Sequence, residues 1–333
     1  MQPESENRAA VEKSAQSANE IRYVAGADVG GTNLRLALAD LSGTILARWS
    51  TSTVGLRGPE AVVERICSGV RMMLQQVSAP CEMLRSIAIG VPGIADVENG
   101  VVVAASYLMG WKDVPLRALV ESRLNVPAVV DNDVNVAAIG EQWAGSAKNA
   151  TDFVFLAIGT GIGAGIVLNG HLYRGSSWAA GEIGYMLLPG AADLPASVDE
   201  PGALEKRIGG EGIKGQWKKI CLPEESGFNA TEIFDLALDG NPRAQTLLHQ
   251  SATTLAQAIY NISRILNCPL FVLGGTVGLH RALCDAAQRL LDQWMASDSP
   301  RLVRSVLGAD AQIMGALRLA LDSERSCARL IST

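Results

Sequence analysis

Two spacings of apolar residues alternate along the chain. Short apolar segments are typical of buried strands, and longer stretches with an apolar residue every three or four positions are typical of helices. Between residues 21 and 52 the pattern reads strand, Gly-rich turn, strand, turn, strand, which predicts an antiparallel meander. Further strands are expected at residues 85–91, 100–104, 125–133, 152–158, 164–170, 171–175, 269–275 and 301–306. Helices are expected at residues 59–77, 134–145, 202–219, 229–239, 243–266, 279–295 and 313–322.

The opening pattern occurs twice. Asp28-Val-Gly-Gly-Thr-Asn and Gly159-Thr-Gly-Ile-Gly each lie between two predicted strands, about 130 residues apart in the sequence. The chain therefore resembles two copies of one β-hairpin device, each in its own domain. A domain boundary is expected between residues 130 and 150.

Composition and charge exclude several classes of protein. With 333 residues, 48% of them hydrophobic, the chain is long enough for two compact domains. The net charge of −6 and the lack of a basic block disfavour a nucleic-acid or membrane-surface partner. No apolar run reaches the ~20 residues of a membrane span, and residues 1–20 are polar, which predicts a disordered tail and no signal peptide. The six cysteines form no CxxC pair, as is typical of a cytoplasmic protein.

The two Gly-rich turns are candidate phosphate-binding sites. In the dinucleotide-binding fingerprint a helix opens directly after the glycines, but here β-like residues follow Gly163, so we reject that interpretation. Backbone N–H groups of Gly-rich turns can still form a concave anion site, and two such turns could hold a nucleotide triphosphate between them. The alternative is a pair of ordinary hairpin turns. Asp28, before the first turn, could hold Mg²⁺ through water.

The order of motifs makes a family resemblance specific. The chain resembles the ROK family of sugar kinases and sugar-responsive repressors, within the actin/hexokinase/Hsp70 ATPase superfamily. The resemblance rests on ADVGGTNLRLAL (27–38), GVPGIADVENGVV (90–102), GWKDVPL (110–116), VPAVVDNDVNVAAIGE (126–141), AIGTGIGAGIVLNG (157–170), GEIG (181–184), VLGGTV (272–277) and GADAQIMGALRLA (308–320).

This resemblance implies an α/β fold, namely the two-domain actin-like ATPase (ribonuclease H-like) fold with an interdomain cleft. It implies a small domain of residues 21–130 plus the C-terminal helix 312–325, and a large domain of residues 131–311. It also implies ATP and Mg²⁺ as cofactors. The residues it places around the nucleotide are Asp28, Gly30, Gly31, Thr32, Asn33, Thr160, Gly161, Gly163, Gly274 and Gly275.

By the same resemblance, Asp133 is the catalytic residue. A sugar hydroxyl is a poor nucleophile, and a carboxylate that accepts its proton typically contributes ~10²–10⁴-fold. The alternative role for Asp133 is a plain helix N-cap, and Asn132 is an equally suitable cap. The resemblance places Gly93, Asn132, Glu182 and Glu205 at the sugar. The alternative for both glutamates is a solvated surface position.

The chain departs from the family pattern at the sugar site. Many relatives have a histidine after GEIG and a CxCGxxGC cluster that bind zinc, but this chain has Tyr185 there and no Cys or His between residues 187 and 204, so no zinc site is expected. Tyr107 replaces an asparagine that usually contacts the sugar. The sugar identity therefore stays open. Only about 20 residues precede the first strand, too few for the helix-turn-helix domain of the repressors.

The expected function is ATP-dependent phosphorylation of a hexose, most simply glucose at its 6-hydroxyl, with Asp133 as general base. A kinase for N-acetylmannosamine, N-acetylglucosamine or fructose, with polyphosphate as another donor, and a non-catalytic sugar sensor are the alternatives. The resemblance also implies a cytoplasmic homodimer that acts on a small-molecule sugar in glycolysis or related carbohydrate metabolism.

Overall fold

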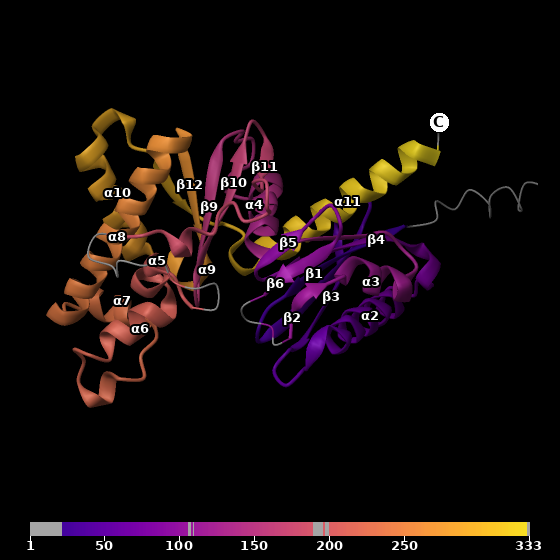
Figure 1. Ribbon diagram of the computed structural model, residues 1–333, viewed down its shortest axis with the longest axis horizontal. Helices are drawn as coiled ribbons and strands as arrows, with labels where there is room; N and C mark the ends of the chain where they lie inside the picture. Colours follow the sequence, from indigo (N-terminus) through magenta and orange to yellow (C-terminus); the bar gives the residue numbers. More distant parts are fainter. Residues whose placement is uncertain (1–21, 106–107, 109, 189–195, 197–199, 332–333) are drawn as a thin grey trace, which may run out of the picture.

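The computed structural model describes residues 22–105, 108, 110–188, 196 and 200–331. The predicted tail of residues 1–20 and Tyr107 lie outside these residues. The described part contains two five-stranded sheets and a small three-stranded sheet. Figure 1 shows the two large sheets in separate halves of an elongated molecule.

The first large sheet has the strand order β3-β2-β1-β4-β8. Its strands are β1 (Tyr23–Val29), β2 (Asn33–Asp40), β3 (Ile45–Ser52), β4 (Leu84–Val91) and β8 (Ala128–Asn132). The first three pair antiparallel, which confirms the predicted meander, while β4 and β8 add in parallel. Helices α2 (Gly58–Gln76) and α3 (Leu116–Leu124) bury their apolar residues on one face of this sheet.

The second large sheet has the order β11-β10-β9-β12-β13. Its strands are β9 (Phe153–Ile158), β10 (Ile162–Leu168), β11 (His171–Tyr173), β12 (Leu270–Gly274) and β13 (Arg301–Arg304). One face packs against a set of helices that supply Leu204, Ile213, Ile233, Leu255 and Leu283 to the core. These helices are α5 (Ala203–Ile208), α6 (Gly210–Trp217), α7 (Ala230–Leu238), α8 (Pro242–Leu266) and α10 (Arg281–Met295), and the short α9 (Gly275–Gly278) follows β12.

Several elements differ from the sequence-based prediction. The single helix expected at residues 202–219 is divided at Gly209, whose backbone is extended. Residues 92–96, for which no strand was predicted, contain β5 (Ile94–Asp96), which forms the small sheet with β6 (Val101–Ala104) and β7 (Lys112–Val114). Helix α3 was not expected, because only Leu116 and Val120 are buried along it and its apolar pattern is weak.

Two helices lie between the large sheets. Helix α4 (Asp133–Ala144) joins β8 of the first sheet to β9 of the second, and α11 (Ala311–Ile331), longer than expected, returns from β13 to the first sheet, where it packs against Val24 and Ala88. The helices cross in backbone contact, since a Cβ added to Gly315 would lie 1.7 Å from the Val136 carbonyl oxygen. This topology supports the proposed division at about residue 130, which remains a proposal.

Hydrogen bonds also tie the two connections between the sheets to each other. The Ser146 hydroxyl donates to the Arg304 carbonyl oxygen at 2.8 Å and accepts from the Val306 N–H at 3.0 Å. The buried Glu141 carboxylate accepts from the Ser305 hydroxyl. The segment after α4 and the segment before α11 are therefore held together at one place. No helix among the described residues is long and apolar enough to span a membrane.

Candidate active site

The site is built around the point where β8 ends and α4 begins. The Asn132 side-chain oxygen accepts hydrogen bonds from the N–H groups of Val134 and Asn135 at 2.9 and 3.0 Å, so Asn132 is the N-cap of α4. Its amide donates to the Gly93 carbonyl oxygen at 2.7 Å. Of the two capping candidates, the helix therefore uses Asn132. Asp133 is the first residue of the helix, and its carboxylate accepts from the Val134 N–H at 2.9 Å.

The Asp133 carboxylate is held in an unusual protonation state for an aspartate. The side chain is only partly buried by surface area, but loss of hydration raises its pKa to about 7. The negative charge of Asp28, and to a lesser extent that of Glu182, adds to the shift, and the Val134 N–H opposes it. These carboxylates come from distant parts of the sequence, so the fold brings them within electrostatic range. A carboxylate with such a pKa can accept a proton near neutral pH.

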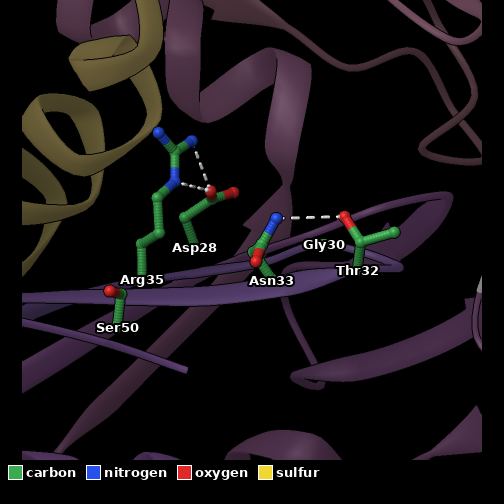
Figure 2. Close-up of a pocket in the computed structure, with 6 residues that line it drawn as sticks. All are labelled: Asp28, Gly30, Thr32, Asn33, Arg35 and Ser50. Atoms are coloured by element: carbon green, nitrogen blue, oxygen red, sulfur yellow. Dashed lines mark hydrogen bonds and ion pairs between the residues drawn. The ribbon is translucent and has the colours of Figure 1, made fainter. Parts of the chain in front are cut away.

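The first Gly-rich turn presents charged and polar groups around a hollow. Figure 2 shows this hollow, of about 370 Å³, which is lined by Asp28, Gly30, Thr32, Asn33, Arg35 and Ser50. Asp28 is buried, and its Oδ2 accepts from Arg35 Nε and Nη2 at 2.9 and 2.6 Å. Burial raises the pKa of Asp28, and the guanidinium opposes that shift. The turn itself is closed by a hydrogen bond from the Gly30 N–H to the Asn33 carbonyl oxygen at 2.8 Å, and Gly31, Thr32 and Asn33 are exposed.

The second Gly-rich turn and the strand that follows it contact two helices. The carbonyl oxygens of Gly159 and Thr160 accept from the N–H groups of Gly210 and Glu211 at the start of α6, at 2.7 and 3.3 Å. A Cβ on Gly163 would lie 3.1 Å from a methyl group of Val134 in α4. Gly159 also donates its N–H to the Gly161 carbonyl oxygen at 3.0 Å. The turn thus connects α4 to α6, and Thr160 remains exposed.

Gly274 and Gly275 lie beside the second turn. A Cβ on Gly275 would lie 2.4 Å from the Ile158 carbonyl oxygen, and its φ of +75° also favours glycine. A Cβ on Gly274 would lie 2.4 Å from the Phe155 ring. Packing on β9 therefore requires both glycines, whatever their proposed role toward adenosine.

The remaining predicted sugar residues converge on β10. Glu182 precedes a short 3₁₀ turn, Ile183–Tyr185, and is exposed. Loss of hydration around its carboxylate, together with the charge of Glu205, raises its pKa. Glu205, in α5, accepts from the Ile162 N–H at 3.1 Å. The carboxylates of Asp28, Asp133, Glu182 and Glu205 thus form a continuous series in which each charge acts on the next. Tyr107, the other predicted sugar contact, lies outside the described residues.

The backbone at Gly93 leaves no room for a side chain. Its φ is +92°, and an added Cβ would lie 2.1 Å from the Ala104 carbonyl oxygen. The close approach of two backbone segments therefore explains the glycine, and its hydrogen bond to Asn132 fixes the start of α4 against the small sheet.

Among the described residues, no group of three His, Cys, Asp or Glu side chains could hold a metal ion. The donor set at the first turn is one carboxylate, Asp28, with the Thr32 hydroxyl lining the same hollow. Hard oxygen donors of this kind fit Mg²⁺ that keeps most of its water.

Two ion pairs at the site were not anticipated from the sequence. One is Asp28–Arg35, and the other joins Arg174 to Asp131, which is 1% exposed and accepts at 3.0 and 2.6 Å. Asp131 also accepts from the Asn132 N–H at 2.8 Å, so this pair braces the β8–α4 junction. The available signal was an arginine within the otherwise apolar segment LRLALA, residues 34–39.

Comparison with known proteins agrees with this architecture. A glucokinase from Halalkalibacterium halodurans is 29% identical, covering 92% of this chain and 97% of the relative. An N-acetylmannosamine kinase from Escherichia coli is 32% identical over 88% of this chain and 97% of its own length. A xylose repressor from Caldicellulosiruptor bescii is 25% identical over 77% of this chain and 66% of its own length.

A solved structure of a ROK family glucokinase from Streptomyces griseus, in complex with glucose and AMPPNP, superposes with a TM-score of 0.74 at 25% identity, over 90% of this chain and 99% of the other. The predicted fold class, the α/β two-domain actin-like ATPase fold, is confirmed. The family model described as "ROK family" matches residues 24–323. The chain belongs to the ROK family.

Proposed function

We propose that this protein is an ATP-dependent sugar kinase that phosphorylates the 6-hydroxyl of a hexose, with glucose as the preferred acceptor. The observation that carries the proposal is Asp133, a partly exposed carboxylate with a pKa of about 7 that Asn132 relieves of the capping role. The glucokinase and N-acetylmannosamine kinase relatives, which match over most of the chain, support the sugar kinase class.

In the proposed reaction, Asp133 accepts the proton of the sugar hydroxyl as its oxygen attacks the γ-phosphorus. The new O–P bond forms while the bond from the γ-phosphorus to the bridging oxygen breaks, and ADP leaves. Because the pKa of Asp133 is near 7, the carboxylate is ionised in a large fraction of molecules at neutral pH and is still a useful base. The amides of the two Gly-rich turns, with Gly30, Gly31, Thr160, Gly161 and Gly163, hold the phosphates.

Mg²⁺ would be held by Asp28 through water, and when bound it supplies charge neutralisation on the phosphate oxygens. Asp28 is buried and held in place by Arg35, so its carboxylate would orient that water shell. The adenosine lies against Gly274 and Gly275 in this proposal.

For the sugar, we propose contacts from Asn132, Glu182 and Glu205, with Gly93 at the backbone. Carboxylates suit this role because each accepts several hydroxyl protons in a defined geometry. Tyr185 and Tyr107 each offer one phenol hydroxyl on a bulky ring, which either stacks on a face of the sugar or narrows the pocket and excludes an N-acetyl group. The sugar panel described below distinguishes these two outcomes.

A second candidate is a kinase for N-acetylmannosamine, because a relative of that name is 32% identical. N-acetylglucosamine and fructose are further acceptors to test, and polyphosphate is a further donor. A non-catalytic sugar sensor is the alternative of a different class, and the xylose repressor relative favours including it.

A coupled assay of ADP release over a panel of hexoses and N-acetylhexosamines tests the proposal. We expect turnover with ATP and Mg²⁺, with the highest kcat/KM for glucose. If kcat/KM is highest for N-acetylmannosamine, then that sugar and not glucose is the preferred acceptor, and the proposed mechanism is unchanged. Calorimetric binding of a sugar, with no turnover of any sugar by either donor, would instead support a sensor.

We also propose that the protein acts in the cytoplasm as a homodimer, in glycolysis or a related carbohydrate pathway. Cell fractionation tests the location. Light scattering of the purified chain tests the assembly, for which a monomer at all concentrations would be the contrary result.

A further inference from the structure

The loop between Arg174 and Glu182 is closed at its start and fixed at its end. The Arg174 carbonyl oxygen accepts from the Ala180 N–H at 3.1 Å, which closes the loop on itself. The Gly181 carbonyl oxygen accepts from the Ala164 N–H of β10 at 2.8 Å. A Cβ on Gly181 would lie 1.9 Å from the Ala164 carbonyl oxygen, so the loop ends directly against that strand. The position of Glu182, the next residue, therefore follows the position of the loop.

The Arg174 side chain extends from this loop to the first large sheet. Its Nε and Nη2 donate to Oδ2 of Asp131, in β8, at 3.0 and 2.6 Å. The Asp131 side chain is 1% exposed, and that of Arg174 is 25% exposed. Two donors of one rigid guanidinium on a buried carboxylate fix orientation as well as distance. The loop that follows β11 is therefore held in a defined place against the end of β8.

Asp131 connects that loop to the start of α4. While Oδ2 binds the guanidinium, Oδ1 accepts from the Asn132 N–H at 2.8 Å. The Asn132 side chain caps α4, and Asp133 is the first residue of the helix. Figure 1 also shows β11 beside α4. One buried carboxylate thus contacts the arginine of the loop that carries Glu182 and the helix end that carries Asp133.

The separation between Asp133 and Glu182 has to be held against repulsion. Loss of hydration raises the pKa of Asp133, and the charges of Asp28 and Glu182 add to the shift, so these carboxylates repel one another. In the proposed function Asp133 and Glu182 contact the same sugar molecule. A misplacement of about 1 Å at such a site can cost ~10²-fold in rate. An ion pair that joins the loop to the helix start opposes that misplacement.

We propose that Arg174 is a positioning residue, which sets the separation between Glu182 at the sugar and Asp133, the general base. The inference rests on the proposed function for the roles of these two carboxylates, and it holds for any of the candidate sugars. Arg174 acts through the loop on one side and through Asp131 on the other. Loss of the pair should weaken sugar binding and turnover and leave nucleotide binding at the two Gly-rich turns unchanged.

Arg85 provides a matched control. It lies in β4 and pairs with Glu324 of α11 at 3.4 Å, so it also joins a sheet to another element. Its side chain is 35% exposed, and that of Glu324 is 9% exposed. Val91, the residue of β4 that pairs with Asn132, lies roughly 20 Å further along the strand. Loss of an ion pair should lower stability at either arginine, but only Arg174 should affect the sugar.

The test is steady-state kinetics with sugar and ATP varied separately, together with calorimetric sugar binding and thermal denaturation of each variant. The sugar is glucose, or the one that the panel identifies. For Arg174→Met we expect the KM and Kd of the sugar to rise about 10- to 100-fold, the loss expected for a charged hydrogen bond, and the KM of ATP to change less than about twofold. We also expect kcat to fall about tenfold or more. Arg174→Lys should give an intermediate sugar KM, and Arg85→Met should leave both KM values within about twofold.

A double variant separates position from stability. Arg174→Met leaves the buried Asp131 charge unpaired, so its Tm should fall. Asp131→Asn combined with Arg174→Met removes this charge and keeps an oxygen for the Asn132 N–H. The double variant should therefore recover most of the lost Tm, while its sugar KM stays raised because the loop is no longer held.

An unchanged sugar KM in Arg174→Met, an equal rise in both KM values, or a sugar KM that recovers with Tm in the double variant would overturn the inference. If Arg174→Met does not fold, the double variant and Arg174→Lys decide by the same two KM values. If the unmodified chain binds sugar but phosphorylates none, the proposed function fails. A weaker sugar Kd in Arg174→Met would then still support the role of Arg174, and an unchanged Kd would refute it. No binding of any sugar to the unmodified chain would refute both.

Discussion

The two Gly-rich hairpins have the same topology and different surroundings. The β1–β2 turn carries Asp28 and is closed by its own hydrogen bond, with three exposed residues at its tip. The β9–β10 turn has no charged residue, and its carbonyl oxygens accept from the start of α6. In the strand that follows, Gly163 and Gly165 lie directly under α4.

The difference teaches that a repeated pattern of glycines can lie in two different packing environments. In the first hairpin, glycine gives a tight turn beside charged groups. In the second, glycine lets a helix approach the sheet. The first turn of α4 interacts with both hairpins. Asp28 of the first hairpin acts electrostatically on Asp133, and Gly163 of the second hairpin contacts the next residue, Val134.

Replacement of Asp133 tests whether the carboxylate beside the first hairpin takes part in the chemistry, and it should have the largest effect. In Asp133→Ala we expect kcat to fall ~10²–10⁴-fold, because the proposed general base is lost, while the Kd for the sugar stays within a few-fold. Steady-state kinetics and calorimetry on the same preparation measure both. Near-normal turnover would remove Asp133 from the mechanism.

The raised pKa of Asp133 also predicts a change in stability. A carboxyl whose pKa is higher in the folded state stabilises the fold below its unfolded value near 3.8, and this contribution is lost as pH rises to about 7. Asp133→Asn should therefore raise the free energy of unfolding at pH 8 by about 2–4 kcal/mol and have little effect at pH 4. Urea denaturation at the two pH values checks this, and an equal effect at both would argue against a shifted pKa.

Replacement of glycine in the second hairpin tests whether α4 needs a residue without a side chain beneath it, and it should have the smallest effect. A Cβ on Gly165 would lie 2.6 Å from Ala138 Cβ and 3.0 Å from the Val134 carbonyl oxygen, so Gly165→Ala should cost about 1–3 kcal/mol of unfolding free energy. Gly159→Ala is the matched control, because an added Cβ there meets nothing within 4 Å. We expect its stability to stay within about 0.5 kcal/mol. Equal losses in the two variants would contradict the packing interpretation.

Most of the framework could be predicted from the sequence because its signals are local. The meander, both hairpins and the helix after Asn132 follow from alternation, glycines and capping residues. Helix α3 and the break at Gly209 were missed, since one has little apolar pattern and the other depends on Gly210 bonding to Gly159.

The sequence suggested candidate residues for the site, but it could not show the contacts that they make. Asp133 and Asn132 could each cap a helix, and only the folded chain shows which one does. The pairing of Asp28 with Arg35 depends on the register of two strands, and that of Asp131 with Arg174 joins segments far apart in the sequence. Ion pairs of this kind leave no periodic signal.

The backbone contact between α4 and α11 has a consequence for the Asp133 carboxylate at the N-terminal end of α4. About 10 Å of helix separates Gly140 from Asp133 at 1.5 Å per residue. If the two helices rotated by about 10° around their contact, the end of α4 would travel roughly 2 Å, which is more than proton transfer across a hydrogen bond tolerates. The contact is made by Gly315 and by Gly140, where an added Cβ would lie 2.1 Å from the Ala311 carbonyl oxygen, so no long side chain can change its rotamer there to loosen it. Gly140 and Gly315 thus fix the position of a carboxylate that lies about two helical turns from Gly140.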